Sequence, residues 1–196
     1  MENGDEEPER VTIIDLPGHR SEVKVAAISS DSKLILSASF ESIKIWNSES
    51  GACIRTLECE NVLCAQFIQG NEYILAGTKE GNLRIFELAT GSEADPVVAH
   101  SGAIWSIAMR PDKKGFATGS ADKTVKFWEF KISSTRAEGF KIKNFRSLQV
   151  AEDVLCVKYS PDCRYIAVSL LDLTVKVFFE DTLKFYLNLF GHKLPV

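Results

Sequence analysis

The amino-acid sequence predicts an all-β protein made of repeated antiparallel sheets, and three observations support this. A run of apolar, basic, apolar and aromatic residues occurs four times, ending at Trp46, Phe86, Trp128 and Phe178. These endings recur at intervals of about 40 to 50 residues, the period of stacked repeat architectures. Between them, short apolar runs alternate with turn residues. The residues of the repeated run are therefore expected to lie between neighbouring units, which leaves function to the surface.

The third unit shows the pattern of one repeat most clearly. Strands are expected around 103–107, 116–120 and 125–128, separated by turns at Pro111-Asp112 and Ala121–Lys123. A fourth strand is expected after a longer loop. Four short antiparallel strands in about 40 residues are typical of a β-propeller blade. The sequence therefore predicts four four-stranded blades that form a partial, open propeller.

The same unit resembles the WD-repeat family of propellers. The residues that carry the resemblance are His100 before the first strand, Thr118 in the second, Asp122 in the tight turn and Trp128 at the end of the third. The resemblance implies that these four side chains form one hydrogen-bonded tetrad. A buried indole N–H needs an acceptor, and the hydroxyl and imidazole relay that bond to the carboxylate.

The other units follow the same positions with two kinds of residues. Unit 1 offers His19, Ser37, Glu41 and Trp46, with Glu41 in a turn that is one residue shorter. Units 2 and 4 have an apolar residue in place of the hydroxyl and Phe in place of Trp. Unit 2 offers Glu58, Ala76, Glu80 and Phe86, and unit 4 offers Val150, Val168, Asp172 and Phe178. Phe in place of Trp removes the N–H, so the hydroxyl and imidazole are not needed. Units 1 and 3 are therefore predicted to contain a hydrogen-bonded network at these positions, whereas units 2 and 4 are predicted to pack apolar side chains there.

The predicted organisation places residues 1–10 in a disordered acidic tail and residues 11–196 in the partial propeller. The units are expected at about 17–58, 59–99, 100–149 and 150–190, with a truncated fifth unit beginning at 191–196. Since the array is expected to continue, the isolated chain should expose the faces of its end blades and associate through them.

Composition excludes several classes of function. No apolar run is long enough for a transmembrane helix, and the N-terminus does not resemble a signal peptide. The five cysteines are an odd number without metal-ligand spacing, which indicates small core residues in a reducing compartment. His100, Thr118 and Asp122 include the residue types of a hydrolase triad, but burial between blades would deny them a substrate. We expect no catalytic residues, no metal, no cofactor and no enzyme activity.

Two surfaces are candidates for binding. In WD-repeat proteins, the residue before the turn carboxylate and positions at the start of the inner strand often face partners. In this sequence such a partner-binding face comprises Lys24, Phe40, Leu63, Lys79, Trp105, Leu155 and Leu171. The alternative is that the apolar members pack in the central channel or on each other.

The second candidate is an insertion at 131–146, which is expected to be a basic loop. Its cations are Lys131, Arg136, Lys141, Lys143 and Arg146. A basic loop on a rigid scaffold suits RNA phosphates or an acidic protein. The alternative is a solvated, mobile insertion without a partner.

The segment from Asp153 onward carries a more specific resemblance. Residues 167–172, 174–178 and 181–196 are similar to one branch of the WD-repeat family, the subunits of the UTP-B subcomplex of the small-subunit processome. This resemblance implies a nuclear, nucleolar scaffold for protein–protein interaction in pre-rRNA processing and ribosome biogenesis. The implied partners are other WD-repeat processome subunits and a contact with pre-rRNA or small nucleolar RNA, with no membrane and no small-molecule substrate. The alternative is a WD-repeat substrate receptor or signalling adaptor that binds peptide motifs and is unrelated to RNA.

Overall fold

The structure is a computed structural model that describes residues 18–68, 70–131 and 140–194. These residues form four sheets of four strands, each an antiparallel meander in chain order. The acidic tail expected at 1–10, Arg136 and the last two residues lie outside the described residues. The predicted all-β fold of four four-stranded blades is confirmed.

The strands of each blade follow one another along the chain. Blade 1 holds β1 (Val23–Ile28), β2 (Leu34–Ser39), β3 (Ser42–Asn47) and β4 (Cys53–Glu58). Blade 2 holds β5 (Val62–Ile68), β6 (Tyr73–Thr78), β7 (Asn82–Glu87) and β8 (Val97–Val98). Blade 3 holds β9 (Ile104–Met109), β10 (Gly115–Ser120), β11 (Thr124–Lys131) and β12 (Lys141–Gln149). Blade 4 holds β13 (Val154–Tyr159), β14 (Tyr165–Leu170), β15 (Val175–Phe179) and β16 (Phe185–Leu189).

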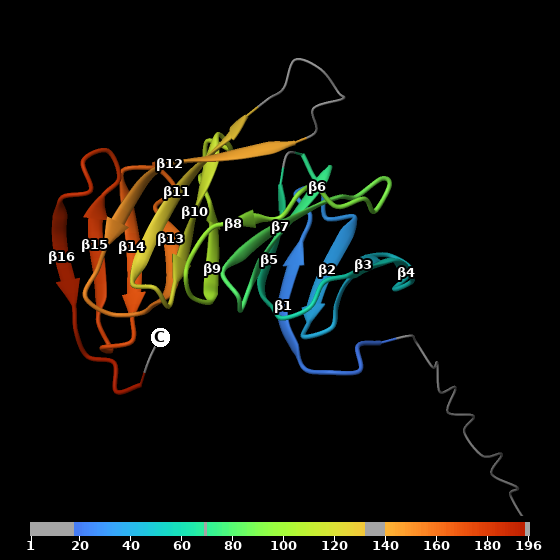
Figure 1. Cartoon of the computed structure of the whole chain (residues 1–196), viewed down its shortest axis with the longest axis horizontal. Coiled ribbons are helices and arrows are strands. Elements are labelled where there is room, and N and C mark those ends of the chain that lie inside the picture. The colour runs from blue at the N-terminus through green and yellow to red at the C-terminus, as the bar shows by residue number, and fades with distance from the viewer. Residues whose placement is uncertain (1–17, 69, 132–139, 195–196) are drawn as a thin grey trace, which may run out of the picture.

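The blades stand side by side in an arc that does not close into a ring (Figure 1). Their first strands, β1, β5, β9 and β13, contact each other in sequence and line the inside of the arc. The fourth strands lie at the outer edge of each sheet. This is the open propeller predicted from the repeat.

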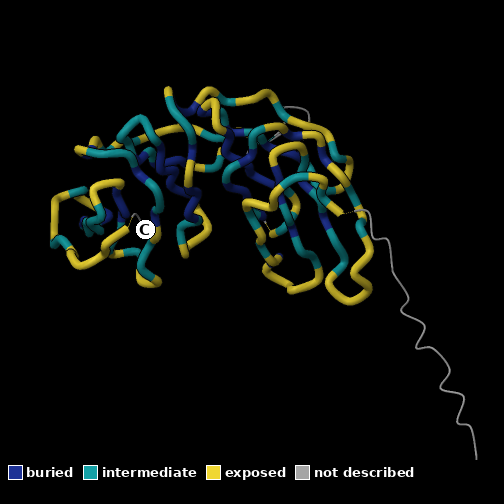
Figure 2. Tube along the Cα trace, turned by 90° about the horizontal axis from the view of Figure 1, so that it is seen from below, coloured by how far each residue is buried: buried dark blue, intermediate teal, exposed yellow. Residues whose placement is uncertain are grey.

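Apolar side chains between neighbouring blades form the core. Ile43 and Ile45 of blade 1 pack with Phe67 of blade 2, and all three are buried. Leu83 of blade 2 packs with Phe116 of blade 3 in a second cluster, and a third cluster joins blades 3 and 4. Figure 2 shows the buried positions along the strands and the exposed ones in the connecting turns. Alternate residues of each strand face opposite neighbours, which explains the apolar spacing of the repeated run.

The turns define two faces of the arc. We call the narrow face the one that carries the tight turns between the second and third strands, such as 120–124 in blade 3. The wide face carries the turns between the first and second strands. Each wide-face turn contains one non-glycine residue in the left-handed region, and these are Ser32, Asn71, Lys113 and Cys163.

The insertion of blade 3 differs from the predicted loop because most of its described part is paired. Lys131 lies opposite Lys141, and Phe130 lies opposite Ile142, so β11 and β12 extend as a hairpin. We call this extension, residues 129–131 with 140–143, the arm. The expectation of a loop through residue 146 was therefore wrong for 141–146. Phe130, Phe140 and Ile142 explain the pairing, since they pack against the cluster between blades 2 and 3 and leave the lysines outside.

Candidate functional site

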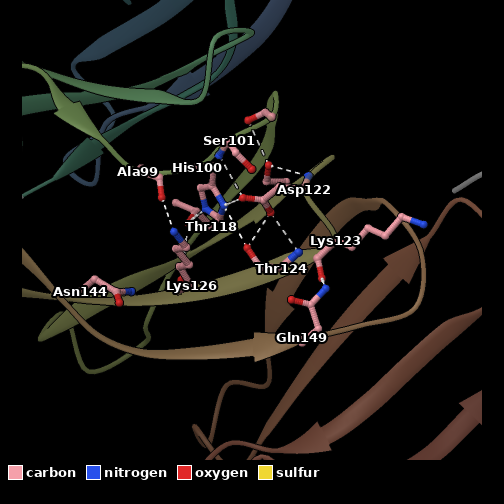
Figure 3. A network of polar contacts seen from close by, with 12 residues as sticks. Ala99, His100, Ser101, Thr118, Asp122, Lys123, Thr124, Lys126, Asn144 and Gln149 are labelled. Atoms are coloured by element: carbon pink, nitrogen blue, oxygen red, sulfur yellow. Dashed lines mark hydrogen bonds and ion pairs between the residues drawn. The ribbon is translucent and has the colours of Figure 1, made fainter.

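The tetrad of blade 3 forms one continuous network. Figure 3 shows three of its members, His100, Thr118 and Asp122, together with Thr124. Trp128 donates its indole N–H to the Thr118 hydroxyl oxygen at 2.9 Å. That hydroxyl lies 2.7 Å from His100 Nε2, and His100 Nδ1 lies 2.9 Å from an oxygen of Asp122. The other Asp122 oxygen accepts the Thr124 hydroxyl at 2.6 Å and the Thr124 backbone N–H at 3.0 Å. The carboxylate therefore holds the tight turn and the imidazole together.

These contacts fix the protonation of His100. Since Thr118 accepts from Trp128, its own proton is free to go to Nε2, and Nδ1–H then donates to Asp122. Burial lowers the pKa of His100, although the hydrogen bond that His100 donates to the Asp122 carboxylate opposes this. Burial works against ionisation of Asp122, but bonds from Thr124 and His100 lower the pKa of that carboxyl. A neutral imidazole beside an ionised carboxylate follows.

The network is placed for structure rather than for chemistry on a substrate. The Thr118 side chain is fully buried, and His100 is only 3% exposed. A hydroxyl nucleophile needs both an adjacent base and access for the substrate. His100 is an adjacent base for Thr118, but the Thr118 hydroxyl proton and oxygen already form hydrogen bonds inside the blade. The role that fits these bonds is to hold β10, β11, their tight turn and the segment before β9 together.

Blade 1 forms only part of the corresponding network. Trp46 donates to the Ser37 hydroxyl at 2.8 Å, and Ser37 lies 2.7 Å from His19 Nε2. His19 Nδ1 is buried and has no hydrogen-bond partner among the described residues. Glu41, predicted as the fourth member, is exposed and does not reach it. The shorter turn is the reason, because it lacks the extra residue that presents Asp122 in blade 3.

Blades 2 and 4 hold apolar side chains at these positions. Ala76 and Phe86 are buried in blade 2, as are Val168 and Phe178 in blade 4. Asp172 still accepts the backbone N–H of Thr174 at 3.1 Å and its hydroxyl at 2.6 Å, as Asp122 does for Thr124. The turn bond is thus kept where the imidazole is absent.

The candidate partner-binding residues all lie on the narrow face. Lys24, Leu63, Trp105 and Leu155 are each the second residue of an inner strand, and the register shifts at that residue in all four sheets. Such β-bulges re-aim a side chain out of the pleat. The same registers place these bulges beside the tight turns that carry Phe40, Lys79 and Leu171. The sequence indicated the positions but not the bulges that turn them outward.

Three of these apolar side chains are well exposed. Phe40 is 52% exposed, Trp105 43% and Leu171 46%, whereas Leu63 and Leu155 are half-buried. Lys79 is exposed, and Lys24 forms an ion pair with Glu22. Aromatic and apolar groups that remain in water at the rim of a rigid scaffold are typical of interaction surfaces.

The basic residues of the insertion separate into two groups. Lys131, Lys141 and Lys143 are exposed on the arm. Arg146 instead binds blade 4, donating to the carbonyl of Asp181 at 2.8 Å and to the carbonyl of Glu180 at 2.6 Å. It also forms an ion pair of 2.9 Å with the buried Glu180 carboxylate. Arg146 is therefore an inter-blade clamp, not a free cation of a loop.

Arg55 makes the same kind of clamp between blades 1 and 2. It donates to the carbonyls of Ala89 and Thr90 at 2.9 and 3.0 Å. Both arginines follow a bulge on the outer strand, after Ile54 in β4 and Phe145 in β12. Sequence reasoning missed this pair. The shared feature is an outer-strand arginine that pairs opposite the residue before the unit's tryptophan, Arg55 opposite Ile45 and Arg146 opposite Phe127.

Reactive or metal-binding groups do not gather elsewhere in the described part of the chain. Burial raises the pKa of Cys59 to about 11 and that of Cys64 to about 12, so both thiols stay protonated. Within residues 18–68, 70–131 and 140–194, no three His, Cys, Asp or Glu side chains are grouped to hold a metal ion. The same residues contain no helix long and apolar enough to cross a membrane.

The four-stranded meanders, the blade 3 tetrad and the repeated tight turns define a WD-repeat β-propeller. A family model described as the WDR3 second beta-propeller domain matches residues 22–196, and the chain belongs to that family. The chain is 50% identical over 193 residues to WD repeat-containing protein 3 of Mus musculus, covering 97% of this chain and 20% of the relative. It is 46% identical over 198 residues to U3 small nucleolar RNA-associated protein 12 of Saccharomyces cerevisiae, covering 96% and 21%.

More distant relatives carry other names. The chain is 27% identical over 172 residues to autophagy-related protein 16 of Arabidopsis thaliana, covering 83% of this chain and 32% of the relative. Against the relatives above 40% identity, the chain spans only about a fifth of their length (20% and 21%). It therefore corresponds to one part of those proteins.

Proposed function

We propose that this propeller is a non-catalytic scaffold of the nucleolar small-subunit processome, acting in pre-rRNA processing and small ribosomal subunit biogenesis. The single observation that carries the proposal is the similarity along nearly the whole chain to a protein named for association with U3 small nucleolar RNA, at 46% identity. The proposal brings with it a nuclear, nucleolar location, other WD-repeat processome subunits as partners, and contact with pre-rRNA or small nucleolar RNA.

The placement of side chains supports a scaffold rather than an enzyme. His100, Thr118 and Asp122 have the residue types of a catalytic triad, and their polar atoms are engaged with one another inside blade 3. What the surface offers instead is the row of bulge and turn residues on the narrow face. We assign protein partners to that face, with Trp105 as its largest exposed apolar side chain.

A WD-repeat receptor or adaptor that binds peptide motifs is the second candidate. The exposed apolar rim of the narrow face favours it. The chain is also similar over most of its length to autophagy-related protein 16, a relative whose name does not refer to RNA. The identity of 27% against 46% to 50% for the processome relatives places this candidate second.

The test is affinity purification of the complete protein from nuclear extract, followed by identification of its proteins and RNAs. The proposal expects WD-repeat processome subunits and U3 small nucleolar RNA. Recovery of a peptide-bearing client without these components would support the receptor instead. Trp105→Ala tests the narrow face: loss of the protein partners with an unchanged melting temperature supports an interface, while a lowered melting temperature shows that Trp105 is a packing residue.

A further inference from the structure

The wide face of blade 3 carries a feature that the other blades lack. Here the arm extends β11 and β12 beyond the sheet toward blade 2 (Figure 1). It is anchored by aromatic contacts, since Phe140 stacks on Tyr73 with ring centroids 4.6 Å apart and packs against Phe130 at 5.4 Å. The arm therefore presents its other side in a defined orientation.

That other side is a row of lysines. Lys131 and Lys141 lie directly opposite each other across the two strands, and Lys143 lies opposite Glu129. Alternation along a strand places all four side chains on one side, away from Phe130 and Ile142. Like charges directly opposite one another in a sheet are unfavourable unless an anion lies between them.

The lysine row is not neutralised by the described carboxylates. In residues 18–68, 70–131 and 140–194, no carboxylate lies within ion-pair distance of Lys131, Lys141 or Lys143. The nearby acids Asp112 and Glu180 are engaged by Arg110, at 3.2 and 3.7 Å. Glu129 is the one described acid on the same side, against three lysines.

A hollow of about 220 Å³ opens beside this row, and Glu129 is part of its wall. Its other walls include the rings of Phe145 and Tyr159, and the cations Arg110 and Lys114. Phe145 is 42% exposed, while Tyr159 is half-buried. Aromatic faces next to cations are the elements with which proteins hold unpaired bases and their phosphates.

We infer that the wide face of blade 3 binds single-stranded RNA, with phosphates on Lys131, Lys141 and Lys143 and one base in the hollow against Phe145. The inference rests on the proposed function in taking the anion as RNA rather than as an acidic protein. The hollow supports the same choice, because a carboxylate chain needs the lysines but has no use for a ring platform.

The first experiment measures binding of a short fluorescein-labelled oligouridylate to the complete protein by anisotropy, over a range of KCl concentrations. Lys131→Gln, Lys141→Gln and Lys143→Gln together should weaken binding about tenfold or more and reduce the slope of log affinity against log salt by about 2. The matched control changes three exposed lysines elsewhere, Lys33→Gln, Lys184→Gln and Lys193→Gln, and should leave both quantities unchanged. Equal affinity and slope in the two triple variants would overturn the inference.

The second experiment concerns the base. Phe145→Ala should weaken the same RNA about five- to a hundredfold, and Phe145→Trp should restore it, because stacking tolerates either ring. Ile54→Ala removes the apolar side chain at the same repeat position of blade 1 and serves as the control. A polyglutamate peptide of the same charge that displaces the RNA equally well would assign this face to an acidic protein and refute the RNA assignment.

Failure here can be told apart from failure of the proposed function. If the wild-type protein recovers processome subunits but its oligouridylate affinity does not depend on the arm, the RNA surface is wrong and the scaffold stands. If the arm binds RNA but processome components are not recovered, the RNA surface stands and the proposed processome function is wrong.

Discussion

Blades 1 and 3 contain the same histidine, hydroxyl and tryptophan, yet only blade 3 completes the network. In blade 3 the imidazole bonds at both nitrogens, to Thr118 and to Asp122. In blade 1 it bonds only to Ser37, and Nδ1 has no partner among the described residues. The difference is one residue of backbone in the tight turn.

That residue has a defined conformation. Lys123 closes the blade 3 turn with a φ of 65°, and Gly81 and Leu173 do so in blades 2 and 4. Blade 1 passes from Phe40 and Glu41 directly into β3 without a left-handed residue. The longer side chain of Glu41 does not make up for the missing backbone. Turn length, not residue type alone, therefore decides whether a tetrad forms.

The largest effect is expected for Thr118→Val in blade 3. It leaves the Trp128 N–H and one imidazole nitrogen unpaired in the core, at about 1–3 kcal/mol each, so the free energy of unfolding should fall by about 3 kcal/mol. Ser37→Ala in blade 1 should cost only about 1 kcal/mol, because that site is partly open to solvent. Urea-induced unfolding followed by fluorescence measures both. Thr118→Ser is the control, and equal losses at the two sites would remove the distinction.

A concerted change in blade 3 should cost less than the single one. Changing His100→Val, Thr118→Val and Trp128→Phe together copies the Val150, Val168 and Phe178 of blade 4. No buried donor is then left without an acceptor, so this triple variant should be about 1 kcal/mol or more stable than Thr118→Val. A triple variant less stable than the single one would show that the apolar and networked blades are not interchangeable solutions.

Acid should weaken blade 3 more than blade 1. The folded pKa of His100 is lowered by burial, so the unfolded chain binds the proton more readily. The contribution of the neutral His100 to folding stability is therefore complete above the ordinary histidine pKa of about 6.5, and it is lost as the pH falls below that value. Asp122, whose folded pKa is also lowered, adds a further loss only below its ordinary value of about 3.9.

The two histidines provide the check on this pH dependence. His100→Gln should flatten the decline in melting temperature between about pH 7 and 5. His19→Gln should change it less, since His19 is less buried and its pKa is lowered in a more solvated site. A larger flattening with His19→Gln would contradict the assignment of the titration to blade 3.

The smallest effect is a gain in blade 1. Glu41→Asp with one glycine inserted after it reproduces the length of the Ala121-Asp122-Lys123 turn. The new carboxylate should reach His19 Nδ1 and raise the free energy of unfolding by about 0.5–1 kcal/mol. The same insertion with Glu41→Ala separates the bond from the effect of turn length, and a gain in that control would assign the stabilisation to the loop alone.

The sequence predicted the blades well because their signals are local. Alternating apolar residues and turn residues recur in each unit, and the structure has four sheets of four strands where those signals occur. The alternation of Trp and Phe units was also readable, because a tryptophan N–H, a hydroxyl and an imidazole are present or absent together. Glu41 shows the limit of prediction from residue type. Its carboxylate suggested a tetrad member, but the shorter turn does not bring it within reach of His19.

Contacts between blades were harder to predict because they depend on three-dimensional register. Arg146 appeared to belong to a basic loop, but the bulge at Phe145 turns it toward blade 4. The pairing of Lys131 with Lys141 depends on the contact between Phe140 and Tyr73, which is distant from Phe140 in the sequence. Neither contact has a signal within its own segment of sequence.

The two arginine clamps have a mechanical consequence. Arg55 ties blade 1 to blade 2, and Arg146 ties blade 3 to blade 4, through directional bonds to backbone carbonyls. No arginine makes such a clamp between blades 2 and 3 in the described residues, where the Tyr73–Phe140 stack, the apolar cluster around Leu83 and Phe116, and a bond from the Cys64 thiol to the Ile104 carbonyl make the contacts. Ring faces slide past one another more readily than a guanidinium leaves two carbonyls. Under tension the arc should therefore bend first between blades 2 and 3, while blades 1 and 2 and blades 3 and 4 stay together as pairs.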